Sequence, residues 1–326
     1  MRAKGRINLK IAFLDAKTLG KDADLSVLDK FGKAYIYETT KNEDVVARSA
    51  GCDIVITNKT AIDRAAVNSL DKLKLICVAA TGTNIVDIDA CREKGVAVTN
   101  VAGYSTASVA QITFGLLFYL LESLAYHDNF VKSGLYAESD TFNHLGRPFR
   151  ELCSMRFGVI GLGAIGAKVA AIAESFGSEV VYYSTSGKNK NSTFKGVSLE
   201  ELLSSSDIVS IHCPLNEKTK NLIDYEKLKM MKRTAILLNT ARGGIVCEAS
   251  LARAIDENLI AAAGIDVYTK EPISADNPLL TVKNREKIIL TPHIAFTSVE
   301  ARKRLAAEIA ENISAFIRGE KRNRVD

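Results

Sequence analysis

A strand that runs into a glycine-rich turn and then into a helix is the feature that most restricts the fold of this chain. Residues 156–166 read RFGVIGLGAIG, with Gly161, Gly163 and Gly166 in G-x-G-x-x-G spacing. The first glycine permits a tight turn, the second lets the backbone approach a pyrophosphate, and the third lets the helix lie close to its strand. The start of a helix also attracts phosphate through free N–H groups and its positive dipole end. The segment predicts a dinucleotide-binding turn, and the alternative is an ordinary glycine turn of an α/β protein.

Length and composition place the chain among globular proteins of two domains. It has 326 residues, of which 47% are hydrophobic and 25% charged, and its formal charge of +5 is spread along the chain. This gives no support to a nucleic-acid or membrane-surface role. The N-terminus lacks an apolar signal core, and no apolar run approaches the roughly 20 residues of a membrane span. We therefore expect a cytoplasmic protein with no nucleic-acid or membrane partner.

The six cysteines lie far apart, without a C-x-x-C pair or histidines at ligand spacing. This pattern is typical of reduced, mostly buried cysteines, and it predicts no metal site.

Short apolar runs alternate with helix-compatible stretches along most of the chain. Runs of this length and character are typical of buried parallel strands. The sequence therefore predicts an α/β fold with two doubly wound parallel-sheet domains. The predicted strands are residues 10–14, 34–37, 53–57, 73–78 and 96–99 before the glycine turn, and 180–183, 207–211, 235–238, 261–265 and 287–290 after it.

The two domains are predicted to be nested in the sequence. A dinucleotide fold needs about six strands, and residues 101–295 contain them, so residues 1–100 and 296–326 are assigned to the other domain. A single apolar helix over 105–126 is predicted as the hinge, and a helix over 298–318 is predicted to return to the first domain. Such a layout places a small-molecule cleft between the domains. The polar, irregular stretch 133–152 is interpreted either as an arm that packs on a second subunit or as a surface loop.

Three residues that could carry the chemistry of a site follow predicted strands, at the sheet edge where ligands bind. Arg242 follows the strand 235–238, and its guanidinium can clamp a carboxylate through two parallel hydrogen bonds. Glu271 and His293 follow the next two strands. A histidine held by a carboxylate keeps its proton near neutral pH and can exchange it with a substrate oxygen during hydride transfer. Each residue alone also fits a structural role, but their common placement favours a catalytic one.

At this point the chain resembles the D-isomer-specific 2-hydroxyacid dehydrogenases, and within them the glycerate dehydrogenase or hydroxypyruvate reductase branch. The resemblance covers nearly the whole sequence. It implies a Rossmann nucleotide-binding domain inserted into a flavodoxin-like substrate domain, and a homodimer built around the hinge helix and the arm. The motifs that carry it are ATGTNIVD (80–87), NVAGYSTASVAQ (100–111), the glycine turn, HCPL (212–215), NTARGGIV (239–246), GIDV (264–267) with Glu271-Pro272, and TPHIA (291–295).

The resemblance also implies a role for individual residues. Arg242 would hold the substrate carboxylate, His293 would be the proton donor and acceptor beside the cofactor, and Glu271 would orient His293. Backbone N–H groups of Thr81, Gly82 and Thr83 would bind the same carboxylate. The cofactor would be contacted by Thr81, by Ala164 and Ile165 at the pyrophosphate, and by Asp266 and main-chain groups around Cys213 and Thr240 at the nicotinamide or its ribose.

The sequence departs from the family pattern at two positions. Many members end the second strand of the nucleotide domain with an acid that binds the adenosine ribose and repels a 2′-phosphate. Here Ser184 stands in that place, and Lys188 and Lys190 follow, so both NAD(H) and NADP(H) remain open as cofactors. Phe296 stands where many relatives carry tryptophan.

The expected reaction is hydride transfer between a nicotinamide cofactor and a short 2-oxoacid. The expected substrates are hydroxypyruvate or glyoxylate, giving D-glycerate or glycolate. The alternative is a nucleotide-sensing interaction protein on the same fold, like the C-terminal-binding corepressors.

Overall fold

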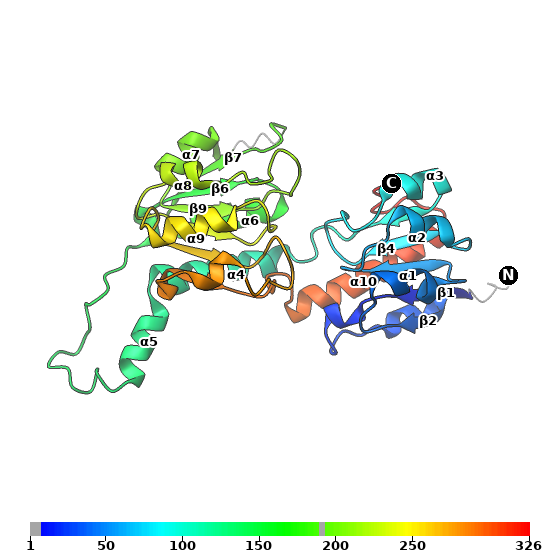
Figure 1. Ribbon diagram of the computed structural model, residues 1–326, viewed down its shortest axis with the longest axis horizontal. Helices are drawn as coiled ribbons and strands as arrows, with labels where there is room; N and C mark the ends of the chain where they lie inside the picture. The colour runs from blue at the N-terminus through cyan, green and yellow to red at the C-terminus, as the bar shows by residue number, and fades with distance from the viewer. Residues whose placement is uncertain (1–7, 189–192) are drawn as a thin grey trace. The chain divides into compact units, whose positions relative to one another are not determined.

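The computed structural model describes residues 8–188 and 193–326, and it divides the chain into two compact units. The first unit is Met1–Ser105 with Thr297–Asp326, and the second is Thr106–Phe296. In Figure 1 the first unit is drawn in blue, cyan and red, and the second in green to orange. The prediction put the limits at residues 100 and 295. Lys190 lies outside the described residues.

The first unit is built on a five-stranded parallel sheet in the order β2-β1-β3-β4-β5. This is the flavodoxin-like strand order. Its strands are β1 (Leu9–Phe13), β2 (Gly32–Ile36), β3 (Ile54–Thr57), β4 (Leu75–Val78) and β5 (Ala97–Thr99). Its helices are α1 (Val45–Ser49), α2 (Arg64–Ser69), α3 (Ile88–Lys94) and α10 (Val299–Ile317), with 3₁₀ turns η1 (Ala16–Leu19), η2 (Ser26–Phe31) and η3 (Asn42–Asp44).

Local sequence explains where the helices of the first unit begin. Asp63 and Asp87 cap α2 and α3 by accepting hydrogen bonds from the backbone N–H groups of Ala66 and Ala90, at 2.8 and 2.7 Å. Ser298 caps α10 in the same way. These side chains satisfy N–H groups that a helix start leaves without a partner.

The second unit contains a seven-stranded parallel sheet in the order β12-β11-β10-β9-β6-β7-β8. This order is the dinucleotide-binding arrangement extended by one strand, and the predicted fold class is confirmed. The strands are β6 (Arg156–Ile160), β7 (Glu179–Tyr183), β8 (Lys195–Gly196), β9 (Ile208–Ile211), β10 (Ile236–Asn239), β11 (Ala262–Ile265) and β12 (Ile288–Leu290). The helices are α4 (Thr106–Leu121), α5 (Leu124–Lys132), α6 (Ala164–Ser175), α7 (Leu199–Ser205), α8 (Tyr225–Met230) and α9 (Glu248–Asp256), with 3₁₀ turns η4 (Leu152–Ser154), η5 (Pro278–Thr281) and η6 (Arg285–Lys287).

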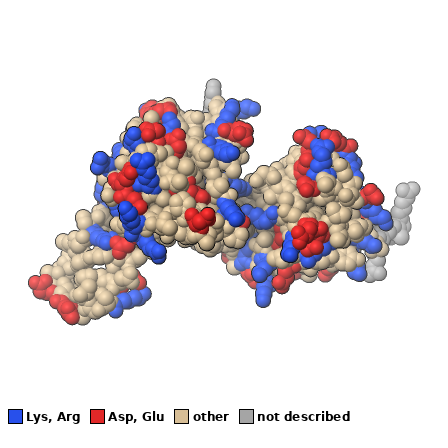
Figure 2. Space-filling view, viewed as in Figure 1, with Lys and Arg blue, Asp and Glu red and all other residues tan. Residues whose placement is uncertain are grey.

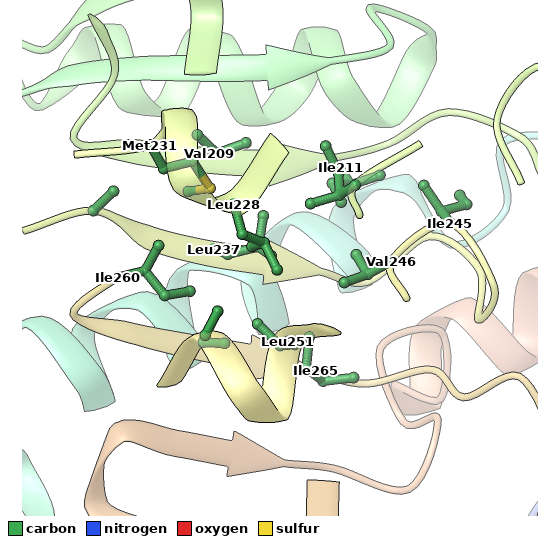
Figure 3. Close-up of a cluster of buried hydrophobic side chains, with 14 of the residues drawn as sticks. Val209, Ile211, Leu228, Met231, Leu237, Ile245, Val246, Leu251, Ile260 and Ile265 are labelled. Carbon is green, nitrogen blue, oxygen red and sulfur yellow. The ribbon is translucent and has the colours of Figure 1, made fainter. Parts of the chain in front are cut away.

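Both faces of the second sheet are covered by helices, which is why its central strands are mostly apolar. Side chains alternate along each strand, so Leu237 joins the cluster with Leu228 and Leu251, while Leu238 joins the cluster on the other face with Leu117. Figure 3 shows the first of these clusters between the strands and helices α8 and α9. Burying such leucine side chains contributes roughly 1.5–3 kcal/mol each to folding.

The prediction of a single helix over residues 105–126 is wrong, because the structure has two helices there. Helix α4 ends at Leu121, Ser123 takes a positive φ of 49°, and α5 starts at Leu124 with a 59° bend. The reason is the change of surroundings, because α4 is buried against the sheet and α6, whereas α5 has no buried residue. Residues 133–151 then form no regular element.

The described residues include no single helix that is long and apolar enough to cross a membrane. Helices α4 and α5 meet that criterion only when they are taken together across their bend, and half of the α4 residues are buried within the second unit. On the face shown in Figure 2, acidic and basic side chains are interspersed over each unit.

Candidate active site

The glycine turn joins β6 to α6 and has the close approaches that its spacing predicts. Gly161 has a φ of 91°, and a Cβ there would lie 2.8 Å from the backbone nitrogen of Cys213. A Cβ on Gly166 would lie 2.1 Å from the carbonyl oxygen of Gly161. Helix α6 begins at Ala164, so its first N–H groups face the turn. The turn is therefore built for a bound phosphate group.

A cavity of about 650 Å³ lies beside this turn. It brings together four of the predicted cofactor residues, Gly161, Gly163, Ser184 and Cys213. Its wall also contains hydroxyl and charged side chains from the loops after β7 and β9, namely Thr185, Ser186, Lys188, Glu217 and Lys218. Glu217 and Lys218 are not among the residues predicted for the site. Their position after the carboxyl end of β9 was the signal that could have found them.

Two side chains of the cavity wall, those of His212 and Cys213, carry no charge at neutral pH. Burial lowers the pKa of His212 to about 3, and its Nε2 lies 2.8 Å from the Ser210 hydroxyl. Burial raises the pKa of the Cys213 thiol to about 11. Because His212 stays neutral over the physiological range, we do not assign it the role of proton donor.

Arg242 lies in a loop that Asn239 holds at the end of β10. The Asn239 side chain donates to the carbonyl oxygen of Arg242 at 3.0 Å and accepts from the N–H of Ala241 at 3.1 Å. Nη1 of Arg242 donates to the carbonyl oxygen of Ala241 at 2.7 Å, which fixes one edge of the guanidinium. The side chain is half-buried, a setting in which charge-assisted hydrogen bonds are strong.

Glu271 and His293 lie on the loops after β11 and β12, and their side chains are close enough to form an ion pair. Nδ1 of His293 lies 2.7 Å from Oε2 of Glu271, and the two side chains are 20% and 27% exposed. Oε1 of Glu271 also accepts from the backbone N–H of Tyr268 at 3.1 Å. His293 has a φ of 54°, and its ring meets that of Phe296 edge-on at 5.5 Å. The carboxylate thus orients the ring through Nδ1 and leaves Nε2 for chemistry.

Asp266 holds the loop that carries His293. It is fully buried, and its carboxylate accepts from the Thr291 hydroxyl at 2.6 Å and from the N–H groups of Ile294 and Ala295 at 2.8 and 2.9 Å. Burial raises the pKa of Asp266, and these hydrogen bonds oppose that effect. The side chain predicted to contact the cofactor is therefore engaged in positioning the His293 loop.

The other predicted residues are placed as follows. The Thr240 hydroxyl lies 3.0 Å from that of Thr113 inside the second unit, so its side chain faces the core. Residues 81–83 belong to the first unit and follow β4. There the Thr81 hydroxyl donates to the carbonyl oxygen of Val101 at 3.1 Å, and Asn100 donates to that of Thr81 at 2.7 Å. No cluster of metal-ligating side chains occurs within residues 8–188 and 193–326.

Comparison with known proteins decides the family. Residues 114–295 match the model of the D-isomer specific 2-hydroxyacid dehydrogenase NAD binding domain. The chain belongs to the D-isomer-specific 2-hydroxyacid dehydrogenase family. The resemblance that the motifs indicated is confirmed, and the cavity lies in the domain that binds a nicotinamide cofactor in this family.

Two curated relatives match over nearly the full length. A hydroxypyruvate reductase of Blautia hydrogenotrophica is 36% identical over 318 residues, covering 95% of this chain and 98% of the relative. A glycerate dehydrogenase of Methylorubrum extorquens is also 36% identical over 318 residues, covering 97% and 99%.

Solved structures of two other dehydrogenase-like enzymes have the same fold. An acyclic imino acid reductase in complex with NADPH and D-Arg superimposes with a TM-score of 0.87 at 28% identity, covering 98% of this chain and 100% of that one. The D-lactate dehydrogenase of Aquifex aeolicus, complexed with NAD and lactic acid, has a TM-score of 0.81 at 27% identity, covering 95% and 96%.

Proposed function

We propose that this dehydrogenase reduces a short 2-oxoacid to the D-2-hydroxyacid, with hydroxypyruvate or glyoxylate as substrate and D-glycerate or glycolate as product. The observation that carries the proposal is the 2.7 Å contact between Glu271 and His293 on the loops after β11 and β12. The names of the two curated relatives support the same substrates. No observation favours the corepressor-like alternative.

Each site residue of this chain has a separate role in the proposed reaction. A reduced nicotinamide, when bound, would supply the hydride for the carbonyl carbon of the 2-oxoacid. His293 donates the proton at Nε2 to the carbonyl oxygen, and Glu271 stabilises the positive charge of the ring through Nδ1. Arg242 holds the substrate carboxylate through the paired hydrogen bonds that a guanidinium can give. In the reverse direction, neutral His293 takes the hydroxyl proton.

A steady-state assay across a panel of 2-oxoacids tests this function. We expect the absorbance of the reduced cofactor to fall with hydroxypyruvate and with glyoxylate, and the product to be the D-hydroxyacid by chiral chromatography. A protein that binds the cofactor but oxidises it with no 2-oxoacid of the panel would contradict the proposed reaction and favour the sensing role.

We further propose that NADP(H) is the preferred cofactor. In the cavity beside the glycine turn, Thr185 and Ser186 contribute hydroxyl groups, and Lys188 and Lys218 contribute two positive charges against the one negative charge of Glu217. These are groups that hydrogen-bond and neutralise a phosphate. The acid that would repel a 2′-phosphate is absent from position 184. The imino acid reductase complex supports the use of NADPH on this fold.

Replacing Ser184 with aspartate is the sharpest test of that preference. A carboxylate beside the 2′-phosphate costs on the order of 3 kcal/mol, so kcat/KM with NADPH is expected to fall about 100-fold. The value with NADH should stay the same or rise, because aspartate can accept from the ribose hydroxyls. Ser175→Asp, at the exposed end of α6, is the matched control. An unchanged ratio of the two kcat/KM values in Ser184→Asp would refute the assignment.

We also propose that the chain forms a homodimer through the segment 124–149 and works in the cytoplasm. The segment exposes apolar side chains that water does not favour, with Phe142 89% and Leu145 79% exposed, together with Leu124, Val131, Leu135 and Phe149. Such a patch marks a protein contact.

The proposed location in the cytoplasm is supported by the cysteines. All six are free thiols, which is typical of a reducing compartment.

Light scattering on the purified protein tests the dimer. The wild-type mass is expected to be twice that of the chain. Replacing both Phe142 and Leu145 with aspartate should give a monomer with unchanged far-UV circular dichroism. A wild-type protein that is monomeric at micromolar concentration would contradict this interface.

A further inference from the structure

The carboxylate of Glu248, which has no proposed part in the reaction itself, accepts two hydrogen bonds from the segment that carries Glu271. Glu248 begins α9, and its Oε1 accepts from the backbone N–H of Thr269 at 2.7 Å. Its Oε2 accepts from the side-chain amide of Asn277 at 2.8 Å. Glu248 therefore holds both ends of the stretch 269–277, and Glu271 lies between the two anchor points.

The other contacts of this stretch include the hydrogen bonds of the Glu271 carboxylate to Tyr268 and His293 and the packing of Ile273 against the hydrophobic core. Residues 269–272 are exposed, whereas Asn277 is buried and its side chain also caps η5 by accepting from the N–H of Leu279 at 3.0 Å. An exposed segment without a regular element has few packing contacts to limit its motion. The hydrogen bond from Thr269 to Glu248 therefore adds a constraint on the exposed backbone just before Glu271.

The same stretch meets the loop of Arg242. A Cβ on Gly243 would lie 1.9 Å from the carbonyl carbon and oxygen of Tyr268 and 2.4 Å from the nitrogen of Thr269, so the two backbones are in direct contact. The Tyr268 hydroxyl in turn donates to the carbonyl oxygen of Thr291 at 3.0 Å, two residues before His293. The loops of the three proposed catalytic residues are thus linked, and Glu248 acts where two of them touch.

We propose that Glu248 is a positioning residue for the Glu271–His293 pair. It acts through the backbone of Thr269 and through Asn277, and its effect on the reaction is the alignment of the Glu271 carboxylate with Nδ1 of His293. The kinetic part of this inference rests on the proposed function, whereas the alignment itself is independent of any substrate.

Three variants of α9 test the inference. Glu248→Ala removes both anchors, and Glu248→Gln keeps one acceptor oxygen for the Thr269 N–H. Asp256→Ala is the matched control, since Asp256 lies on the same helix and accepts from the backbone N–H of Lys283 at 2.9 Å, away from Glu271. Because a misplacement of about 1 Å can cost 100-fold in rate, we expect kcat to fall at least about tenfold in Glu248→Ala. Glu248→Gln should recover part of the loss, and Asp256→Ala should match the wild type.

The double variant with Glu271→Gln separates positioning from a general structural effect. If Glu248 acts through Glu271, adding Glu248→Ala to Glu271→Gln should cost less than about twofold further, since residues that act as a unit are not additive. Independent, multiplying losses would overturn the proposal. Thermal unfolding is followed in every variant, because Glu248 also favours the start of α9.

Proton NMR tests the alignment of the Glu271 carboxylate with Nδ1 of His293 in the absence of substrate. A hydrogen-bonded imidazole Nδ1–H gives a far-downfield resonance, which we assign to His293 by its loss in His293→Asn. We expect this resonance to be lost or broadened in Glu248→Ala and retained in Asp256→Ala. A sharp, unmoved resonance in Glu248→Ala would overturn the positioning role. Absence of 2-oxoacid reduction by the wild type would instead count against the proposed function alone.

Discussion

Replacing His293 with asparagine is expected to lower kcat for 2-oxoacid reduction by about 10³-fold, because the reaction loses its proton donor. The dissociation constant of the reduced cofactor, measured by fluorescence titration, should change little. Asparagine is the suitable substitute, since His293 has a φ of 54° and asparagine tolerates this left-handed conformation better than alanine. His293→Ala should show a similar kinetic loss with an added cost of about 1 kcal/mol in stability.

Glu271→Gln serves as the companion variant. Glutamine can still accept from the ring Nδ1–H but carries no negative charge, so kcat should fall less than in His293→Asn. Equal turnover of the wild type and His293→Asn would remove His293 from the mechanism.

Replacing Arg242 with lysine is expected to lower kcat/KM for the 2-oxoacid by about 100-fold, mainly through KM. Lysine keeps the charge but cannot give two parallel hydrogen bonds to one carboxylate, and the lost charge-assisted bond contributes about 1.5–3 kcal/mol. Steady-state kinetics at saturating cofactor measure the change.

The control for this substitution is Arg253→Lys. Arg253 lies exposed on α9 and pairs with Glu257 at 2.8 Å, and we expect its replacement to leave kinetics unchanged. Kinetic constants of Arg242→Lys that equal those of the wild type would exclude the carboxylate clamp.

The strands were predictable because a parallel strand covered on both faces must be apolar along its whole length. Residues 207–211 and 235–238, for example, are strands β9 and β10 within one residue at each end. The strand β8, residues 195–196, was missed because two exposed residues carry no such pattern. The bend between α4 and α5 was also missed, since the apolar pattern continues through Ser123 and only the loss of packing ends the helix.

The sequence by itself determined the fold class, the dinucleotide turn and the post-strand positions of Arg242, Glu271 and His293. These features depend on local rules, namely the two-residue alternation of strands, the backbone freedom of glycine and the common sheet edge of parallel strands. Only the tertiary structure decided which side chains meet. The Glu271–His293 contact spans 22 residues, and the hydrogen bond from Asn277 to Glu248 spans 29. Both depend on how separate loops fold back on one another, and no spacing along the chain encodes that distance.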